Sequence, residues 1–490
     1  MHRIVSGQPH FLFNVAGTRA IEVAAAANLP PHALMQRAGL QVARLALAVA
    51  PHASTIWLAC GPGNNGGDGL EAAMHLKRWG KDAVVTWLGD EAHAPADALL
   101  SLQRARVEGV AFSNEPPAQA DLCIDALLGI GSTRQPDGRM ASWIAHMRGC
   151  NAPVLAVDIP SALDANTGSG EGCVRADFTL SLLTLKPGLF TAGGRDASGQ
   201  IWFDDLGIQT DSSSEPPCAR LPASPQPASR AHASHKGSYG DVAVVGGAAG
   251  MTGAALMAAT SALHAGAGRV FTCLLADGGP GPDASQPELM FRSFDSLDLR
   301  HMTAVCGCGA GDAVRQVLAR VCSTSARLVL DADALNAIAA DVHLQSLVLA
   351  RAGRGLPTIL TPHPLEAARL LGTSTGKVQA DRLHAAASLA EKFNCVVVLK
   401  GSGTVIAAPG EISVVNMTGN SRLATAGTGD VLAGLNGAVL AAGQPPFQAA
   451  CEAVFLHGLA ADNWPEGATL TAGALARSIS RDQRTAFSSP

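Results

Sequence analysis

The sequence predicts an α/β protein of two domains, each a three-layer α/β/α structure with a parallel sheet between helices. Three observations support this prediction. At 490 residues the chain exceeds the size of one ordinary hydrophobic core. Short apolar runs bounded by Gly alternate with longer helical patterns in both halves. A segment rich in Pro and Ser separates these halves.

The predicted strands are short apolar runs, which are typical of parallel strands buried on both faces. In the first half they cover residues 55–60, 82–88, 121–125 and 154–158, with a helix over 70–79. In the second half they cover residues 242–245, 326–330 and 396–399. Ligands of such sheets bind at the carboxyl ends of the strands, and the unusual residues of this sequence follow these strands.

The segment between the halves runs from Asp211 to Ser229 and reads DSSSEPPCARLPASPQPAS. It has no apolar period, so we expect that burial of side chains cannot offset the entropy lost on ordering it. The sequence therefore predicts a first domain at 1–211, a linker at 212–230 and a second domain at 231–490.

Composition and charge exclude several classes of function. The net charge of −5 is spread along the chain, so no basic stripe predicts nucleic acid or anionic lipid as a partner. Eleven cysteines without framework spacing argue against disulfides and indicate a reducing cytoplasm. Residues 1–13 lack the apolar core of a signal peptide. Residues 242–268 carry no charge, but their Gly, Ala and Thr favour a buried strand, loop and helix over a membrane span.

A glycine-rich loop and two aspartates form the candidate site of the first half. The loop, Gly61–Gly69, reads GPGNNGGDG and leads into a helix, where backbone N–H groups favour an anion. It matches neither a Walker loop nor a GxGxxG turn. Asp125 and Asp158 each end a predicted strand. A tight turn and two helix caps would also explain these residues. Together they predict an oxygen-rich site suited to a hard cation or to sugar hydroxyls.

Four ordered motifs of the first half resemble those of NAD(P)H-hydrate epimerases: LMQRAG, GPGNNGGDGL, DALLGIG and AVDIPSALDANTG. The resemblance implies a Rossmann-like domain and a potassium ion held by Asn65, Asp125 and Ser161. It implies that the hydrated nucleotide contacts Asn64, Asn65, Gly66, Gly67, Asp68, Gly129, Ile130, Gly131, Ser132, Thr133, Arg134, Gln135 and Asp158. Either Asp158 or Asp125 would be the acid–base group. Ala162 replaces a residue that is usually Gly in these epimerases.

The strongest signal of the second half is the run ATAGTGD at residues 424–430, followed by an apolar helix. A turn made of Gly427, Thr428 and Gly429 at a helix start forms an anion hole that directs backbone donors at a phosphoryl group. Asp430 would then accept a proton from an attacking hydroxyl. The alternative is that Asp430 only caps the helix.

Other segments are consistent with a nucleotide site. Residues 400–404, KGSGT, follow an apolar strand and could bind phosphates through the Lys side chain and backbone N–H groups. Asp331 and Asp333 end another strand and suit Mg²⁺ or a ribose. His363 lies between two prolines, where a simple core histidine would be unusual. Cys306 and Cys308 could form a metal or redox pair, but small residues that fill a Gly-rich loop are the preferred interpretation.

The motifs HKGSYG, LDADALN, TPHPLEAARLLG, LKGSGT and NMTGNSRLATAGTGDVLAGL resemble the ribokinase-like superfamily, and within it the NAD(P)H-hydrate dehydratases. The resemblance implies ADP as co-substrate, with Mg²⁺. It implies nucleotide binding by Lys400, Gly401, Ser402, Gly403, Thr404 and Gly429. It implies hydrate contacts with Ala254, Gly309, His363 and Asp430. Asp430 would deprotonate the C6 hydroxyl of the hydrate, which then attacks the terminal phosphate of ADP.

The two resemblances together predict a bifunctional isomerase and lyase that repairs hydrated NADH and NADPH. The first domain would interconvert the R and S hydrates. The second would dehydrate the S form to NAD(P)H while ADP becomes AMP and phosphate. Family members tend to form homo-oligomers, which we also expect here. The alternative is a ribokinase-like kinase of vitamin precursors that carries a non-catalytic N-terminal binding module. The residues themselves distinguish neither ADP from ATP nor NADH hydrate from NADPH hydrate.

Overall fold

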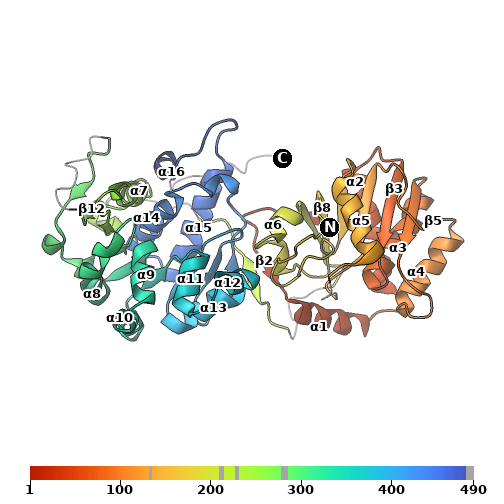
Figure 1. Ribbon diagram of the computed structural model, residues 1–490, viewed down its shortest axis with the longest axis horizontal. Helices are drawn as coiled ribbons and strands as arrows, with labels where there is room; N and C mark the ends of the chain where they lie inside the picture. Colours follow the sequence, from red (N-terminus) through yellow and green to blue (C-terminus); the bar gives the residue numbers. More distant parts are fainter. Residues whose placement is uncertain (132–134, 209–214, 227–230, 277–284, 480, 482–490) are drawn as a thin grey trace. The chain divides into compact units, whose positions relative to one another are not determined.

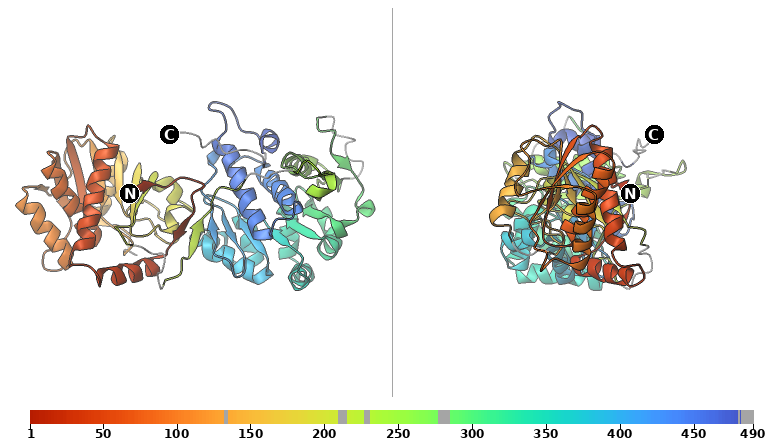
Figure 2. Two further views of the ribbon diagram at one scale, coloured as in Figure 1. Left: turned by 180° about the vertical axis from the view of Figure 1, so that it is seen from behind. Right: turned by 90° about the vertical axis from the view of Figure 1, so that its right-hand side faces the viewer.

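The computed structural model describes residues 1–131, 135–208, 215–226, 231–276, 285–479 and 481 (Figure 1). The chain forms two compact units. Unit 1 contains Met1–Val5 and His10–Arg220, and unit 2 contains Ser6–Pro9 and Leu221–Pro490. Figure 2 shows from other sides how helices cover the sheet of each unit.

The sheet of unit 1 has the strand order β1-β9-β8-β7-β6-β3-β4-β5. Its strands are β1 (His2–Arg3), β3 (Thr55–Cys60), β4 (Asp82–Trp87), β5 (Ala111–Ser113), β6 (Leu122–Ala126), β7 (Val154–Val157), β8 (Phe178–Leu182) and β9 (Gln200–Asp204). Among the described strands of this sheet, only the pairing of β1 with β9 is antiparallel. The strands predicted from the apolar runs are confirmed. The chain order reverses between β3 and β6, which is where doubly wound sheets bind ligands.

Helices cover both faces of this sheet because alternate side chains of its strands point in opposite directions. They are α1 (Val15–Ala26), α2 (Ala33–Val49), α3 (Asn64–Arg78), α4 (Ala96–Val107), α5 (Gly138–Gly149) and the short α6 (Gly194–Ala197). Ile56 and Leu58 of β3 pack in one core with residues of α2 and α3. Trp57 of β3 packs in a second core with Trp143 of α5. The predicted three-layer arrangement is therefore confirmed for unit 1.

The glycine run of the first half is helical, which corrects the interpretation of it as a loop. Helix α3 begins at Asn64, so only residues 61–63 connect it to β3. A Cβ atom on Gly66 would lie 2.0 Å from the Gly61 carbonyl oxygen, and one on Gly67 would lie 2.6 Å from Met35. These glycines are needed because α3 packs closely against its neighbours. The sequence pattern could not distinguish this packing from a ligand-facing loop.

The sheet of unit 2 contains the order β13-β12-β11-β14-β15-β16-β17-β18-β19. Its strands are β11 (Asp241–Gly246), β12 (Arg269–Leu274), β13 (Met290–Phe291), β14 (Thr303–Cys306), β15 (Arg327–Leu330), β16 (Thr358–Leu360), β17 (Val396–Leu399), β18 (Val405–Ala407) and β19 (Val414–Val415). Neighbouring strands from β13 through β17 are parallel, and β18 and β19 pair in the antiparallel direction. The order reverses between β11 and β14, so this edge is the second expected ligand position.

Two helical layers enclose the second sheet. The first layer comprises α7 (Thr252–His264), α14 (Thr428–Ala441), α15 (Pro446–Asp462) and α16 (Ala472–Ser478), which pack on Val242 and Val244 of β11. The second comprises α8 (Val314–Thr324), α9 (Ala332–Ala339), α10 (Val342–Gly353), α11 (Pro364–Leu371), α12 (Thr375–Ala380) and α13 (Arg382–Phe393), on the face of Ala243 and Val245. The uncharged stretch 242–268 forms β11 and α7, as predicted. Within the described residues, no helix has the length and hydropathy that a membrane crossing requires.

Part of the predicted linker is structured, contrary to the expectation that it could not bury side chains. Residues 219–221 form strand β10 (Ala219–Leu221), in which Ala219 and Leu221 are fully buried. Cys218 N–H donates to the Leu12 carbonyl of β2 (His10–Leu12) within unit 1. The expectation failed because these side chains are buried through contacts with residues far away in the sequence. Residues 212–214 and 227–230 of the linker lie outside the described part of the chain.

Candidate active sites

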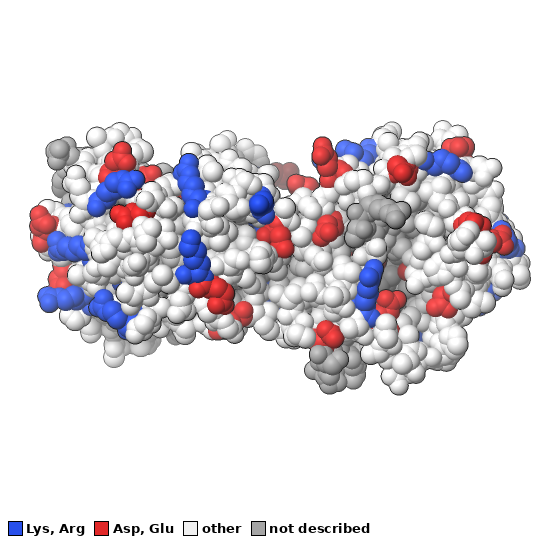
Figure 3. Space-filling view, turned by 60° about the horizontal axis from the view of Figure 1, so that its bottom comes forward, with Lys and Arg blue, Asp and Glu red and all other residues white. Residues whose placement is uncertain are grey.

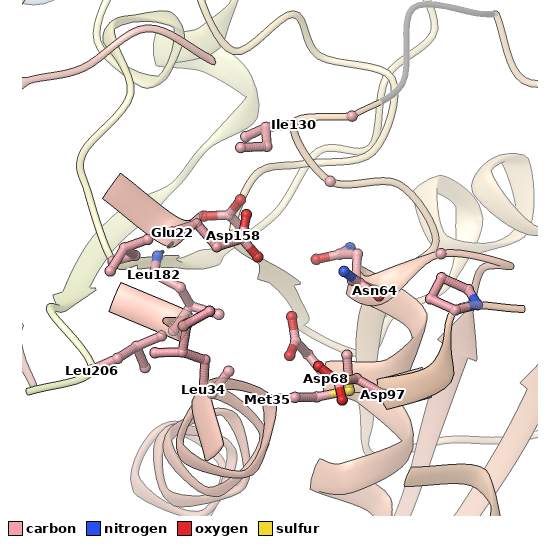
Figure 4. Close-up of a pocket in the computed structure, with 18 of the residues that line it drawn as sticks. Glu22, Leu34, Met35, Asn64, Asp68, Asp97, Ile130, Asp158, Leu182 and Leu206 are labelled. Carbon is pink, nitrogen blue, oxygen red and sulfur yellow. Dashed lines mark hydrogen bonds between the residues drawn. The ribbon is translucent and has the colours of Figure 1, made fainter. Parts of the chain in front are cut away.

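A cavity of about 570 Å³ lies in unit 1 at the carboxyl ends of β3, β6 and β7 (Figure 4). The residues predicted from the sequence that line it are Asn64, Asn65, Asp68, Gly129, Ile130, Gly131 and Asp158. Gly66 and Gly67 are instead buried in the packing of α3, and Gln135 is exposed outside the lining. The predicted contacts Ser132, Thr133 and Arg134 lie outside the described residues.

Asp158 occupies a strained position in the wall of this cavity. Its φ of +66° is in the left-handed region, which is uncommon for residues other than Gly. Its Oδ1 accepts hydrogen bonds from the Lys186 ammonium and from Leu182 N–H, the latter at 3.1 Å. Lys186 is fully buried and also donates to the Leu182 carbonyl at 2.7 Å. Strain that surrounding contacts maintain is typical of functional positions.

Further carboxylates surround Asp158 in the cavity wall. Asp68, Glu22 and Asp97 line it together with the cations Arg19 and Lys186. Burial, and then the charge of Asp158, raise the pKa of Asp68 well above its usual range and also raise the pKa of Glu22. Asp68 and Asp158 come from different elements and border the same space (Figure 4). This part of the cavity therefore suits a neutral hydroxylated ring better than a phosphate.

Asp125 lies below the cavity rather than in its lining. It is fully buried on β6 and accepts hydrogen bonds from Ser161 N–H at 2.8 Å, Ser161 Oγ at 2.6 Å and Leu127 N–H at 3.2 Å. Burial raises the pKa of Asp125 to about 6, although the bonds from Ser161 oppose this shift. The structure thus brings Asp125 and Ser161 together, but it separates Asp125 from the space where Asp158 lies.

Asn65 reaches the same region from α3. A Cβ atom on Gly129 would lie 3.3 Å from the Asn65 Oδ1, so the side chain packs directly on the Gly129 backbone. The Nδ2 of Asn65 is buried and has no hydrogen-bond partner among the described residues. A buried amide with unused capacity indicates that a further polar ligand fits beside it.

Four charged residues of this cavity were not predicted from the sequence: Arg19, Glu22, Asp97 and Lys186. Lys186 could have been found, because it comes four residues after the buried strand β8, at the same sheet edge as Asp158 after β7. Glu22 lies within α1 on an ordinary helical pattern, and no local signal marks it. Its place in the wall depends on how α1 packs.

The second candidate site surrounds the start of α14. The helix begins at Thr428, and its N-cap is Gly427 with a φ of +94°. Asp430 lies in the first turn, so it is not the N-cap that the alternative interpretation required. Burial, and then the charge of Asp331, raise the pKa of Asp430 to about 6, while Lys400 opposes this shift. The Thr428 hydroxyl donates to the Leu423 carbonyl at 2.8 Å and so stabilises the turn itself.

Lys400 brings a positive charge to the same helix terminus. The Lys400 Nζ donates to Asp331 Oδ1 at 2.6 Å. It also lies close to the helix backbone, because a Cβ atom on Gly429 would be 3.5 Å from this Nζ. Burial lowers the pKa of Lys400, but the charges of Asp331 and Glu366 outweigh this effect and raise the pKa above its usual value. The helix N-terminus and the ammonium together favour a phosphoryl group at this position.

Cys308 is part of this cluster, which separates it from Cys306. The Cys308 thiol and the carboxylates of Asp331 and Asp430 have ligand atoms within 4.8 Å of one another. The side chain of Cys306 lies in the core on the opposite face of the sheet. The two cysteines therefore do not form a pair, and no disulfide links the cysteines in the part of the chain that the structure describes.

His363 caps a helix, which is one reason for its place between prolines. Its Nδ1 accepts from Leu365 N–H at 3.1 Å, and Glu366 accepts from His363 N–H at 2.8 Å in a capping box. The imidazole Nε2 lies 3.2 Å from Glu366 Oε1. Burial, and then Lys400, lower the pKa of His363. The ring is thus neutral and fixed in orientation, with almost half of its side chain exposed.

The remaining predicted residues of unit 2 lie in α7, in α9 and in the loops that follow β14 and β17. A Cβ atom on Gly309 would lie 2.8 Å from the Cβ of Ala254, so these two residues are in contact range. Residues 400–404 form the turn between β17 and β18, in which the Thr404 hydroxyl donates to the Gly401 carbonyl at 3.1 Å. Asp333 lies in α9 and accepts from Gly311 N–H at 2.7 Å.

Two family patterns match the chain. Residues 31–188 match the family described as YjeF-related protein N-terminus, and residues 242–483 match the family described as NAD(P)H-hydrate dehydratase. A solved structure of ADP/ATP-dependent NAD(P)H-hydrate dehydratase from Bacillus subtilis, co-crystallised with ATP and Mg²⁺, has 29% identity and a TM-score of 0.43. Its alignment covers 52% of this chain and 91% of that chain.

Full-length relatives share both halves. The bifunctional NAD(P)H-hydrate repair enzyme Nnr of Escherichia coli is 37% identical over 90% of this chain and 87% of its own length. That of Moorella thermoacetica is 35% identical over 89% and 88%. The ADP-dependent (S)-NAD(P)H-hydrate dehydratase of Neisseria meningitidis is 46% identical over 51% of this chain and 86% of its own length. The chain therefore belongs to the family of bifunctional NAD(P)H-hydrate repair enzymes.

Proposed function

We propose that unit 1 interconverts the R and S hydrates of NADH and NADPH, and that unit 2 dehydrates the S hydrate with ADP, which yields AMP and phosphate. The observation that supports this most is Asp430, a half-buried carboxylate in the first turn of α14, where the Lys400 ammonium lies beside Gly429. The names of the E. coli and N. meningitidis relatives support the substrate and the co-substrate.

In unit 2, Asp430 acts as the general base. It takes the proton from the C6 hydroxyl of the S hydrate, whose oxygen attacks the terminal phosphorus of ADP and displaces AMP. The backbone N–H groups of Gly427, Thr428 and Gly429 form the anion hole, and Lys400 to Thr404 hold the nucleotide. The C6–O bond then breaks as the ring nitrogen supplies electrons, phosphate departs, and loss of a C5 proton restores the reduced nicotinamide. Ala254, Gly309 and His363 contact the hydrate.

In unit 1, Asp158 is the acid–base group at the hydrated carbon, and Asp125 is not. Asp158 lines the cavity and is held by Lys186, whereas both oxygens of Asp125 are already bonded to Ser161. A group that exchanges protons with the substrate must be within hydrogen-bond reach of it, and among these two only Asp158 meets this condition. Asn64, Asn65, Asp68 and the residues Gly129, Ile130 and Gly131, which line the cavity, contact the nucleotide.

A potassium ion fits the residues Asn65, Asp125 and Ser161. All three offer oxygen ligands, which hard cations prefer. Asp125 is fully buried, and burial raises the pKa of its carboxyl, so a cation beside it would compensate its negative charge. A cation there would neutralise Asp125 and fix the Gly129 backbone against α3. Exchange of K⁺ for Li⁺ in the assay buffer tests this assignment and should reduce epimerisation alone.

Among the described residues of unit 2, the cluster of Cys308, Asp331 and Asp430 does not make a complete Mg²⁺ site. Asp331 is already bonded to Lys400, and the neighbouring Cys308 offers sulfur, which Mg²⁺ avoids. We therefore infer that Mg²⁺ would arrive on the phosphates of the nucleotide. We also propose a cytoplasmic location and a homo-oligomer, with no nucleic acid or membrane partner. On the face shown in Figure 3, basic and acidic side chains are interspersed without a basic stripe.

The decisive assay uses a mixture of both NADH hydrate epimers and follows recovery of the reduced-nicotinamide absorbance with ADP, ATP or neither. Nearly complete recovery with ADP would support both activities. Recovery of the S portion alone would leave unit 1 as a binding module. No recovery with either nucleotide would overturn the proposal and would instead indicate a small-molecule kinase. The E. coli relative, aligned over 90% of the chain, is named a repair enzyme and does not support that alternative.

A further inference from the structure

A buried arginine stands behind the turn that carries Lys400. Arg382, the first residue of α13, is 1% exposed. Its Nη2 donates to the carbonyl oxygens of Leu399 at 3.1 Å and Lys400 at 3.2 Å, and its Nη1 donates to Gln379 Oε1 at 2.7 Å. The guanidinium thus binds the backbone of two consecutive residues where β17 ends.

Gly401 leaves the space that this guanidinium occupies. Its φ of +140° is a conformation that other residues rarely adopt. A Cβ atom there would also lie 2.9 Å from both terminal nitrogens of Arg382. The plane of the guanidinium therefore packs directly against the Gly401 backbone, and any larger residue would displace it.

The same turn determines where the Lys400 ammonium lies. Lys400 N–H donates to the Pro362 carbonyl at 2.9 Å, and its Nζ donates to Asp331 and lies beside Gly429 at the start of α14. Arg382 holds the carbonyl side of this residue, and Pro362 holds its N–H side. A shift of the turn would move the ammonium away from the position where phosphate charge develops, and small displacements of such groups reduce rates strongly.

We propose that Arg382 is a positioning residue of the dehydratase: it fixes the Leu399–Gly401 backbone so that Lys400 faces the phosphates of ADP at the N-terminus of α14. This inference rests on the proposed role of Lys400. Arg382 itself touches neither the nucleotide nor the hydrate in this scheme. It differs in this respect from the residues already assigned to the nucleotide.

Arg351 provides a matched control within the same unit. It is also 1% exposed, and burial lowers the pKa of both arginines to about 10. Arg351 donates to Ser325 O at 2.9 Å and Thr358 Oγ1 at 2.8 Å, beside the amino ends of β15 and β16. Those strand ends lie at the opposite edge of the sheet from the carboxyl ends that carry the site. A purely structural effect of losing a buried arginine should be the same at both positions.

The test compares Arg382→Gln, Arg351→Gln and Lys400→Met in the full-length protein, with S-NADH hydrate and ADP as substrates. We expect Arg382→Gln to raise the KM for ADP about tenfold, which corresponds to about 1.4 kcal/mol, with little change in the KM for the hydrate. Both Gln variants should lower Tm to a similar extent, because each removes a buried arginine. Arg351→Gln should leave both KM values unchanged. Arg382→Lys retains one donor group and should give an intermediate KM for ADP at near-normal Tm. This variant replaces Arg382→Gln in the comparison if the Gln variant does not fold.

The outcomes separate the inference from the function on which it rests. If Lys400→Met leaves the kinetics with ADP unchanged, the nucleotide site itself is wrong. If Lys400→Met impairs them but neither Arg382 variant changes the KM for ADP beyond twofold, Arg382 is only structural. An equal rise in the KM for the hydrate and for ADP would likewise contradict the inference, because general loosening of the unit would then explain the result.

Discussion

Replacement of Asp430 by Asn, together with the pH profile of the native enzyme, tests the proposed base of the dehydratase. Burial and the charge of Asp331 place the pKa of Asp430 at about 6. A base works when it is ionised, so activity must fall as the pH drops through this value. The ionised fraction is about 0.9 at pH 7 and about 0.1 at pH 5, which predicts a roughly tenfold loss of kcat/KM between these pH values. An aspartate with an ordinary pKa would lose less than about a tenth over the same interval.

The assay follows the reduced-nicotinamide absorbance from pure S-NADH hydrate at saturating ADP. Asp430→Asn should lose about 10²–10⁴-fold in kcat, the usual contribution of a general base, while epimerisation by unit 1 stays intact. Lys400→Met should move the acid limb to higher pH, because Lys400 lowers the pKa of Asp430. Asp341→Asn, which removes the charge at the N-cap of α10 but keeps a capping oxygen, is the control and should leave the profile unchanged. A flat profile from pH 5 to 7, or an Asp430→Asn variant with more than a tenth of native activity, would refute the reasoning.

Three further predictions concern unit 1 and the packing of α14. Asp158→Asn should abolish epimerisation but not dehydration of the S hydrate, whereas Asp97→Asn, in the same cavity, should keep most of both activities, as chromatography of the epimers would show. Ala162→Gly should raise the free energy of unfolding by roughly 0.5–1 kcal/mol, measured by urea denaturation, because Ala162 has a φ of +70° whose strain of about 1–2 kcal/mol exceeds the cost of added chain freedom. Gly434→Ala should destabilise unit 2 by about 1–3 kcal/mol and lower its Tm, because the new Cβ would lie 2.0 Å from the Ala258 carbonyl oxygen.

The strands and the polar residues that follow them could be predicted because both depend on local features of the chain. A short apolar run bounded by Gly fits a buried parallel strand wherever it occurs. The positions of Asp125, Asp158 and Asp430 at sheet edges or helix starts then follow from the fold class. The start of α3 was misjudged because glycines in close helix packing look the same in sequence as glycines in a loop.

The sequence alone determined the two α/β units, the chemistry of their motifs and the family to which they point. Only the tertiary structure decided which carboxylate faces the cavity, since Asp158 and Asp125 occupy equivalent places in the pattern. The reason is that each is oriented by partners distant in sequence: Asp158 by Lys186, 28 residues away, and Asp125 by Ser161, 36 residues away. Likewise, Lys400 pairs with Asp331 across 69 residues, a contact that no local pattern encodes.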